Sequence, residues 1–379
     1  MACSNYWTSP IQVGDQHLAR LFVEAGWDVG YLSTPISPLH YLRGGGDDLR
    51  ERAKLWRGGG ARFLSSKLWA HVPLAMAVPK AAPGLSSAAV FNNWHKLTCP
   101  NLRAQLRRNG FESVDLIYLR DVKFSFLLDT VKAPKSVFRL ADNDAGFREY
   151  TRAHQAAEAR TLQRATHVCY TAKTLENRVT SGVQKRMLLR NGVALENFAT
   201  QHAEPGAFAN IPRPRAIYVG SIEYWFDFEL LTQAARALPN VNFILVGHPE
   251  CAKEKLGALK NVHILGRRPY AEVPAMLQHS DVGLIPFDVA AHPALVNAIN
   301  PIKLYEYLAA GLPTVATAWD ELRYLAPPAE LCDNRQRFIE AIRSVLASPP
   351  EKEPLMAFAR QYDWKAIFQQ LLQFLECDR

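Results

Sequence analysis

Residues 300–317 read NPIKLYEYLAAGLPTVAT, a stretch that predicts a short helix followed directly by a buried strand. Asn300 is a favourable N-cap, and Pro301 suits the first helical position because its missing N–H has no partner there. Gly311 fits the left-handed position just past the helix, and Pro313 prevents the helix from continuing. The apolar run that follows completes one helix–strand unit of an α/β fold.

The first turn of this predicted helix suits an anionic ligand. Free N–H groups and a partial positive charge collect there, and Lys303 adds a full charge. Glu306 lies three residues on, so one helix face offers a cation for a phosphate and a carboxylate for hydroxyls. A sugar nucleotide presents both groups. The simpler interpretation is a solvated Lys303–Glu306 ion pair, which is common on protein surfaces.

Length and composition indicate a folded protein of two domains. The chain has 379 residues, of which 48% are hydrophobic and 21% charged. Six cysteines are scattered without metal-ligand spacing, so we expect reduced thiols in a cytoplasmic protein. No apolar run is long enough to cross a bilayer, and no signal-peptide core is evident. The net charge of +8 favours an anionic partner, although no zinc-finger or RNA-recognition signature points to nucleic acid.

Residues 301–313, written as Pro-x-Lys-x-x-Glu-Tyr-x-Ala-x-Gly-x-Pro, resemble the C-terminal nucleotide-binding signature of the GT-B glycosyltransferases. The resemblance implies an α/β fold with two Rossmann-like domains facing across a cleft and a C-terminal helix returning to the first domain. It also implies that Ile302, Lys303 and Glu306 contact a nucleotide-sugar donor, expected to be UDP-linked, without a further cofactor.

The predicted domains are residues 1–200 and 201–354, with a C-terminal helix, 355–379, that packs back on the first domain. The boundary rests on the proline-containing linker 200–215. After it, apolar runs alternate with segments long enough for crossover helices, which predicts a parallel sheet.

The start of the first domain is less regular. The turn-rich loop from Ser4 leaves little room for a strand before it, so that strand is very short or missing from this start site. Residues 34–100 contain two triple-glycine stretches, with Trp56 and Trp69 in basic surroundings. We expect a mobile insertion with amphipathic pieces that meets an acceptor or a membrane surface.

Acidic residues follow the predicted strand 136–140. Asp142 and Asp144 stand at the carboxyl end of this strand, where open α/β sheets bind their ligands. Either carboxylate is a candidate general base for an acceptor hydroxyl. The alternative is that Asp142 caps a helix running from about Phe147 to Arg164, which leaves the other aspartate free.

Several other residues are candidates for donor binding. Gly14 and Gly220 permit close backbone approach to phosphates, and Ser221 adds a hydroxyl. Arg267 and Arg268 follow a predicted strand, at a position where the base or the phosphates of the donor would bind. A plain loop glycine at 14 and exposed arginines before a turn are equally good interpretations.

The chain also departs from the commonest retaining GT-B pattern. That pattern has two glutamates separated by seven residues, and its first position is Ala298 here. Segments 137–142, 191–193 and 220–221, together with Lys303, look like the glucuronosyltransferases of xanthan assembly. This second resemblance implies Asp142 as the general base and Lys303 as the diphosphate ligand. Asp142 and Asp144 match the DxD motif that binds metal in some glycosyltransferases. They belong to the first domain, which is expected to bind the acceptor, so we expect no metal site here.

The favoured hypothesis is a glycosyltransferase that moves a sugar from a nucleotide-diphosphate donor to a lipid-linked or polysaccharide acceptor in bacterial exopolysaccharide synthesis. We expect a cytoplasmic location, with the inner face of the plasma membrane as a possible surface and no nucleic-acid partner. The alternatives are a sugar-nucleotide 2-epimerase of the same fold and a nucleotide- or glycan-binding protein without catalysis. Basic, tryptophan-bearing residues 56–108 argue against the epimerase, which needs no acceptor site.

Overall fold

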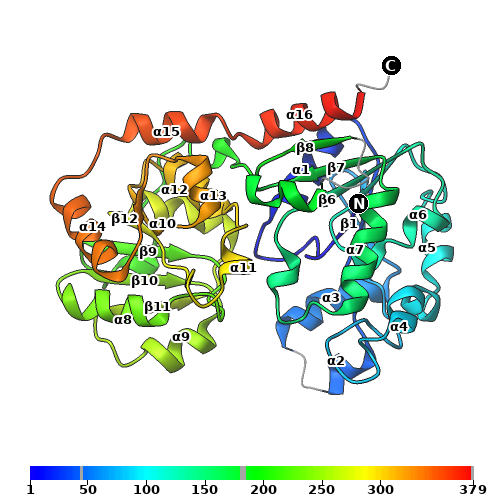
Figure 1. The fold of residues 1–379 in the computed structure, drawn as a ribbon, viewed down its shortest axis with the longest axis horizontal. Coiled ribbons are helices and arrows are strands. Elements are labelled where there is room, and N and C mark those ends of the chain that lie inside the picture. The colour runs from blue at the N-terminus through cyan, green and yellow to red at the C-terminus, as the bar shows by residue number, and fades with distance from the viewer. Residues whose placement is uncertain (43–45, 180–184, 377–379) are drawn as a thin grey trace. The chain divides into compact units, whose positions relative to one another are not determined.

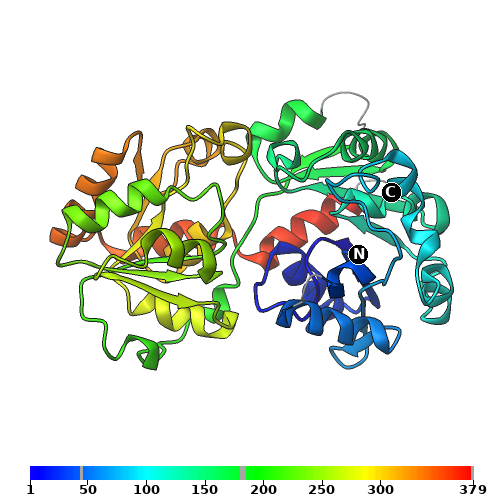
Figure 2. The same cartoon turned by 90° about the horizontal axis from the view of Figure 1, so that it is seen from below.

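The computed structural model describes residues 1–42, 46–179 and 185–376, which form two compact units (Figure 1). The first unit comprises Met1–Leu189 and Phe368–Arg379, and the second comprises Arg190–Ile367. Each unit contains one sheet with helices on both of its faces (Figures 1 and 2). The α/β expectation with two Rossmann-like parallel-sheet domains is therefore confirmed.

The sheet of the first unit has eight strands, and all neighbours are parallel except the first pair. Its spatial order is β3 (Ala61–Phe63), β4 (Leu68–His71), β2 (Val29–Ser33), β1 (Ala2–Cys3), β5 (Leu116–Leu119), β6 (Lys135–Leu140), β7 (His167–Tyr170) and β8 (Arg186–Leu188). The chain order reverses between β1 and β5. The loops after these two strands therefore lie where doubly wound sheets bind their ligands.

The sheet of the second unit has six strands and is entirely parallel. Its spatial order is β11 (Val262–Gly266), β10 (Asn242–Val246), β9 (Arg215–Val219), β12 (Val282–Ile285), β13 (Thr314–Thr317) and β14 (Glu330–Cys332). Here the chain order reverses between β9 and β12, which makes the loops after these strands the expected ligand site.

Helices fill the connections between the strands. In the first unit they are α1 (Gly14–Glu24), α2 (Pro38–Leu42), α3 (Asp47–Arg57), α4 (Ala88–Asn93), α5 (Leu102–Arg108), α6 (Leu127–Thr130) and α7 (Arg152–Arg164). In the second they are α8 (Phe228–Ala237), α9 (Pro249–Leu256), α10 (Val273–Gln278), α11 (Pro293–Val296), α12 (Ile302–Ala309), α13 (Asp320–Leu325), α14 (Arg335–Ala347) and α15 (Lys352–Arg360). The helix α16 (Trp364–Glu376) begins in the second unit and ends in the first.

The boundary between the units lies at Leu189 and Arg190, eleven residues before the position that the linker composition suggested. Asn191 explains the difference because its backbone N–H and side-chain amide both donate to Asn300, at 2.8 and 2.6 Å. Val193 forms a parallel bridge with Asp363. These contacts hold residues 190–200 within the second unit, and α15 packs there against α12.

The predicted mobile insertion is wrong for residues 61–71, which form β3 and β4 at the edge of the first sheet. Leu68 and Trp69 are fully buried in β4, and Trp69 stacks on Phe111. Tryptophan between basic residues suggested a surface, whereas the ring packs into the core. The triple glycine at 44–46 lies mostly outside the described residues. The first strand, β1, is present and very short.

The predicted N-cap of α12 is also wrong. The helix begins at Ile302 after Pro301, and the side chain of Asn300 is engaged elsewhere. Its Oδ1 accepts from the Asn191 backbone, and Tyr305 lies within hydrogen-bonding distance of the same amide. The other end matches the prediction, since Gly311 has a left-handed φ of 66°.

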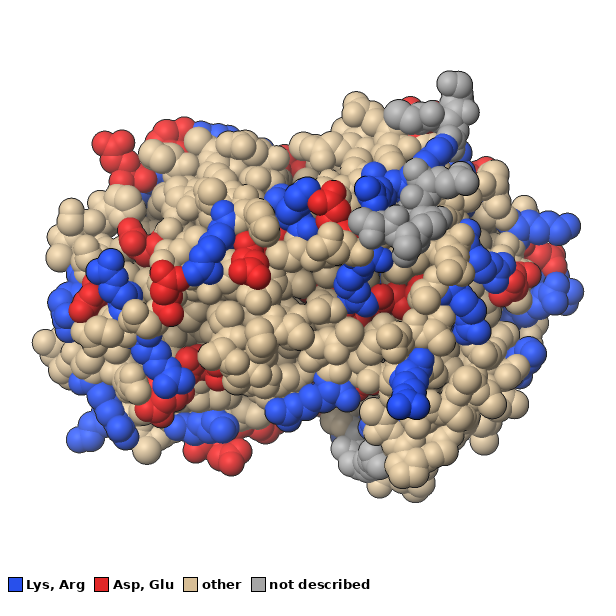
Figure 3. Space-filling model, in the orientation of Figure 1, with Lys and Arg blue, Asp and Glu red and all other residues tan. Residues whose placement is uncertain are grey.

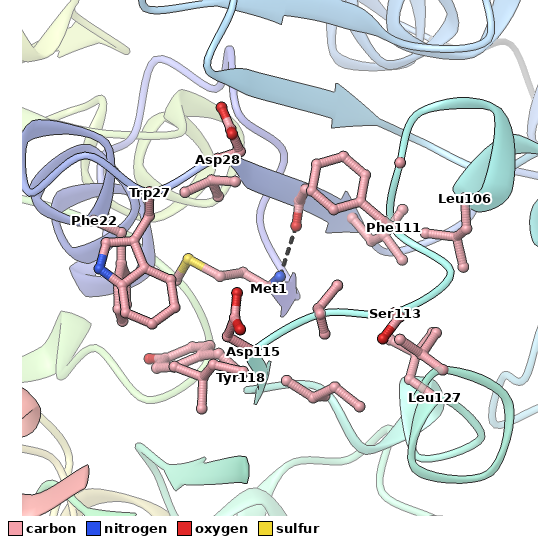
Figure 4. Close-up of a pocket in the computed structure, with 18 of the residues that line it drawn as sticks. Met1, Phe22, Trp27, Asp28, Leu106, Phe111, Ser113, Asp115, Tyr118 and Leu127 are labelled. Carbon is pink, nitrogen blue, oxygen red and sulfur yellow. Dashed lines mark hydrogen bonds between the residues drawn. The ribbon is translucent and has the colours of Figure 1, made fainter. Parts of the chain in front are cut away.

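A cavity of about 610 Å³ lies in the first unit at the amino ends of β1, β2 and β5 (Figure 4). Apolar side chains dominate its wall, including Phe22, Trp27 and Phe111. The terminal amino group of Met1 donates to the carbonyl of Gly30 at 2.6 Å beside it. This cavity contains none of the sequence-predicted site residues and lies at the edge opposite to the carboxyl ends of the strands.

On the face drawn in Figure 3, Lys and Arg side chains are interleaved with Asp and Glu across both units. Among the described residues, no helix combines the length and the apolar character required to cross a membrane.

Candidate functional site

Three neighbouring strands of the second sheet each have a glycine at, or directly after, their carboxyl end. Gly220 follows β9, Gly247 follows β10 and Gly266 ends β11. The N–H of Gly220 donates to Val246 at 2.9 Å, and the N–H of Gly247 donates to Gly266 at 3.1 Å. A β-carbon on residue 247 would lie 2.1 Å from the carbonyl oxygen of Gly220. These three glycines, called the glycine row below, leave the carboxyl ends of the three strands without side chains. The row ends at β9, beside β12, where the strand order reverses.

Lys303 reaches this glycine row from the first turn of α12. Its ammonium lies 4.9 Å from the ring centre of Tyr218 and 4.8 Å from that of Phe287. These rings remove much of the surrounding water, and burial lowers the pKa of Lys303 to about 8. The result is a partly desolvated cation at the start of a helix, between the loops after β9 and β12. Such a cation suits a phosphate.

Glu306 lies one turn further along α12 and is buried. Burial raises the pKa of its carboxyl group, while a hydrogen bond from Tyr270 and the charge of Lys303 oppose the rise. The Lys303–Glu306 pair is therefore not the solvated surface pair of the simpler interpretation. A buried carboxylate next to a cation is an arrangement that recognises hydroxyl groups near a phosphate.

Tyr307 fixes the position of α12 on the sheet. Its hydroxyl accepts from the backbone N–H of Val219 at the end of β9, at 2.8 Å. Its ring lies against Gly283 in β12, where a β-carbon would come within 2.4 Å of it. Any side chain at 283 would push the helix away from the sheet. The small residue and the tyrosine together set the position of Lys303.

Four further predicted donor residues lie in the second unit and differ in their contacts: Ser221, Ile302, Arg267 and Arg268. The carbonyl of Ser221 accepts from Tyr218 at 2.6 Å, which leaves its exposed side chain at the sheet edge. Ile302 is half-buried at the start of α12, and Arg267 is exposed. Arg268 lies 3.8 Å from Glu272, and its Nε is buried without a hydrogen-bond partner among the described residues.

In the first unit, Asp142 and Asp144 converge on one arginine that the sequence reading did not select. Arg120 follows β5 directly, and its Nη2 donates to Asp142 at 2.8 Å. Its Nη1 lies 3.3 Å from Asp144. Burial raises the pKa of Asp142 to about 6, opposed by Arg120 and reinforced by Asp144. Arg120 directly follows the apolar run 116–119 in the sequence, and this position was the signal that could have found it.

The prediction that an aspartate caps the next helix is wrong. That helix, α7, begins at Arg152 rather than near Phe147. Its N-cap is Thr151, whose hydroxyl accepts from His154 N–H while the imidazole of His154 bonds back. Both Asp142 and Asp144 are therefore available to Arg120 and to a ligand.

Gly14 is the first residue of α1 and is buried in the first unit, in the connection after β1. The next residue, Asp15, is also buried, accepts from Tyr118 at 2.8 Å and lies 3.8 Å from Arg139. Gly14 thus stands at the reversal point of the first sheet, beside the strand that carries Arg120. In the second unit, Ala298 occupies the position of the missing glutamate and is buried.

Both halves of the chain match known families. Residues 206–362 match the family of glycosyl transferases group 1, and residues 1–171 match the N-terminal domain of the glucuronosyltransferase GumK. A protein of Bacillus subtilis named for teichuronic acid biosynthesis, the glycosyltransferase TuaH, is 28% identical over 237 residues. That alignment covers 58% of this chain and 59% of the Bacillus protein.

Solved structures share the fold over almost the whole length. Sucrose-phosphate synthase from Thermosynechococcus elongatus superposes with a TM-score of 0.72 at 16% identity, covering 99% of this chain and 98% of that one. The Anabaena protein HepE, solved in complex with UDP and glucose, gives a TM-score of 0.65 at 16% identity with the same coverage. The chain therefore shares the fold of these solved structures over almost its whole length, and its two halves resemble the group 1 glycosyl transferases and the N-terminal domain of GumK.

Proposed function

We propose that this protein transfers a sugar from a UDP-linked donor to a hydroxyl of a lipid-linked or polysaccharide acceptor in the synthesis of a bacterial cell-surface glycan. The observation that carries the proposal is the desolvated Lys303 ammonium beside Gly220, at the reversal point of a parallel sheet. The names of the relatives support the substrate class, since TuaH is named for teichuronic acid and HepE was solved with UDP.

Donor binding is assigned to the second unit. The diphosphate lies at the start of α12 against Lys303 and the glycine row, with Ile302 and Ser221 beside it. Glu306 accepts from hydroxyls of the nucleoside, and Arg267 and Arg268 border the base or the phosphates. Gly14, in the first unit, is a candidate for close backbone approach to phosphates. The contacts between Lys303 and Gly220 and between Glu306 and Tyr270 support this arrangement.

Asp142 is the proposed general base. Its carboxylate accepts the proton of the acceptor hydroxyl as that oxygen attacks the anomeric carbon. The bond from the anomeric carbon to the diphosphate breaks, and Lys303 and the helix start offset the charge on the leaving group. This is an inverting displacement, and Ala298 supports it because no carboxylate stands at the position that retaining relatives use.

The proposed reaction is independent of metal. Asp142 and Asp144, the residues that spell a DxD, already share the guanidinium of Arg120, which supplies the local positive charge. Among residues 1–42, 46–179 and 185–376, no three or more His, Cys, Asp or Glu side chains form a group suited to an ion. The support for the proposal is the lysine at the diphosphate site, which takes the place of a divalent cation.

An exposed apolar patch in the first unit, formed by Met76 and Leu97, suits the membrane that holds a lipid-linked acceptor. These two side chains are 62% and 51% exposed, and Leu42 on α2 of the same unit is 81% exposed. Met76 and Leu97 are joined by a backbone hydrogen bond of 3.0 Å, and Lys96 borders them. We assign this patch to an anionic membrane surface at the cytoplasmic face, since apolar side chains next to basic ones bind such surfaces.

The test is release of nucleotide by the purified chain from a panel of UDP-sugars, with and without detergent-solubilised polyprenyl-diphosphate-linked saccharides. We expect UDP release that depends on the acceptor, with a glycosylated lipid as the product, and turnover reduced at least about a hundredfold in Asp142→Asn. Conversion of the donor to its C2 epimer without acceptor would instead make this chain an epimerase. Donor binding without either reaction would make it a binding protein.

A further inference from the structure

Arg120 occupies the centre of a charged cluster at the reversal point of the first sheet. Its side chain is 13% exposed, and its two terminal nitrogens reach Asp142 and Asp144 separately. The charges of Asp15 and Asp121 also act on it. A guanidinium is a rigid planar fork, so two bonds fix its plane and with it the position of each bound carboxylate.

The cluster has one more carboxylate than cations. It contains four carboxylates and three cations, which are Asp15, Asp121, Asp142 and Asp144, and Arg120, Lys123 and Arg139. Asp121 is held by Lys123 at 2.9 Å, and Asp15 lies beside Arg139. Asp142 and Asp144 are therefore left to share Arg120. Asp142 is the more exposed of the two, at 32% against 21%.

Only one of the two carboxylate oxygens of Asp142 accepts a hydrogen bond from the described residues. Arg120 binds Oδ2, and among the described residues Oδ1 has no protein donor. We propose that Arg120 is a positioning residue that aims Oδ1 at the acceptor hydroxyl, while Asp144 is the counter-ion that keeps Arg120 in place once Asp142 is protonated. This inference rests on the proposed function, because it assumes that Asp142 is the base.

The role of Asp144 follows from the proton balance of the step. The acceptor O–H bond breaks, its proton goes to Oδ1 of Asp142, and the oxygen forms the new bond to the anomeric carbon. The electron pair of the broken glycosyl bond leaves with the nucleoside diphosphate. Asp142 is then neutral, and Arg120 keeps one charged partner in Asp144. Without Asp144, Arg120 would hold Asp142 in its ionised form more strongly and make it a weaker base.

The groups that face this pair come from several elements. Arg120 lies at the end of β5, Arg139 lies in β6, and both lower the pKa of Asp142, whereas Asp144 raises it. From α7, His154 and Glu158 face Asp144, whose charge raises the pKa of both side chains, although burial lowers the pKa of His154 overall. The variants that change the charge of Arg120 or Asp144 therefore shift the titration of Asp142 in opposite directions.

The first measurement is a pH titration of carbon-13-labelled aspartate carboxyls by NMR, with Asp142→Asn used to assign the signal of Asp142. We expect Arg120→Met to raise the pKa of Asp142 by about one unit and Asp144→Asn to lower it by about one unit. Arg120→Lys keeps the charge and leaves the pKa near that of the wild type. An unchanged Asp142 signal in both Asp144→Asn and Arg120→Met would overturn the inference.

The second measurement is transfer by Arg120→Lys with the donor and acceptor that the wild type uses. Because lysine keeps the charge but loses the fork, kcat should fall about ten- to a hundredfold while KM for the donor stays constant. Wild-type kcat in this variant would overturn the positioning role. The matched control is Arg164→Lys, whose partner Asp129 lies on an exposed surface of the same unit, and it should change neither quantity.

The two proposals fail in different ways. A wild-type protein without turnover on any donor refutes the proposed function, whereas an active wild type with an equally active Arg120→Lys refutes only the role of Arg120. Should Arg120→Met not fold, Arg120→Lys and Asp144→Asn still decide the question, since each retains the size and polarity of the native side chain more closely.

Discussion

The side chain of Lys303 occupies the space that a β-carbon on residue 220 would need. Such an atom would lie 2.8 Å from Cε and 3.0 Å from Nζ of Lys303, and Gly220 has a φ of 146°. Two residues that are 83 positions apart in the sequence therefore depend on each other. The lysine reaches the sheet edge only because residue 220 has no side chain.

Gly220→Ala should consequently displace the ammonium and weaken the binding of UDP at least tenfold, measured by isothermal titration calorimetry. A displaced cation loses a direct contact to phosphate, and tenfold corresponds to about 1.4 kcal/mol. Gly84→Ala is the control, because Gly84 also has a positive φ, 75°, but nothing lies within 4 Å of its added carbon. Equal loss of affinity in both variants would show that backbone strain, not Lys303, is responsible.

Lys303→Met should raise the melting temperature of the ligand-free protein at pH 7 while removing UDP binding. Burial lowers the pKa of Lys303 to about 8 in the folded chain, against 10.5 in the unfolded chain. The unfolded chain then binds more protons between pH 8 and 10.5, so wild-type stability rises with pH in that window. The advantage of methionine should be full below pH 8 and shrink toward pH 10.5. A pH-independent difference would contradict the desolvated charge.

On the acidic side of its pH profile, kcat/KM should follow the deprotonation of Asp142. Burial raises its pKa to about 6, and a base must be deprotonated, so the rate should rise with pH through about 6 and level off above it. Asp142→Asn should lower kcat about 10²- to 10⁴-fold and leave UDP affinity unchanged. A limb that persists in residual Asp142→Asn activity would assign the titration to another group.

Glu306→Gln should separate recognition of the nucleoside from recognition of the phosphates. The carboxylate lies one turn beyond Lys303 and is buried. We expect weaker UDP binding and unchanged binding of inorganic pyrophosphate, whereas Lys303→Met loses both. Competition experiments with the two ligands measure this difference. A parallel loss of both ligands in Glu306→Gln would place Glu306 in support of Lys303 alone.

The apolar patch of the first unit can be tested with vesicles. Met76→Asp and Leu97→Asp should each reduce co-sedimentation with phosphatidylglycerol-containing vesicles, because each replaces exposed apolar surface with a negative charge. Tyr324→Asp, on a comparably exposed side chain of the second unit, is the control. Unchanged sedimentation in the patch variants would exclude this surface as the membrane contact.

Local chemistry predicted much of the second unit from sequence. Gly311 and Pro313 predicted the end of α12, and the parallel strands followed from apolar runs with room for crossover helices. Lys303 and Gly220 were selected separately for phosphate binding, and the structure brings them together. What the sequence could not supply was their mutual distance, because that depends on how Tyr307 seats the helix against Gly283.

The incorrect predictions share a physical cause. Asn300 and Asp142 both have side chains that cap helices well, and in both cases a partner distant in sequence took the side chain instead. Trp69 looked exposed because its sequence neighbours are basic, although all four residues of β4 are buried and its ring stacks on Phe111. Local propensity ranks such candidates, and tertiary contacts decide between them.

The central claim is tested most directly by a thermal-shift panel of UDP-, GDP- and other nucleotide sugars on the wild type and on Lys303→Ala. The account predicts that a UDP-sugar stabilises the wild type and that this stabilisation is lost in the variant, although the variant itself remains folded. No stabilisation by any nucleotide sugar, or equal stabilisation of both proteins, would contradict the assignment of the donor site to Lys303 and the glycine row.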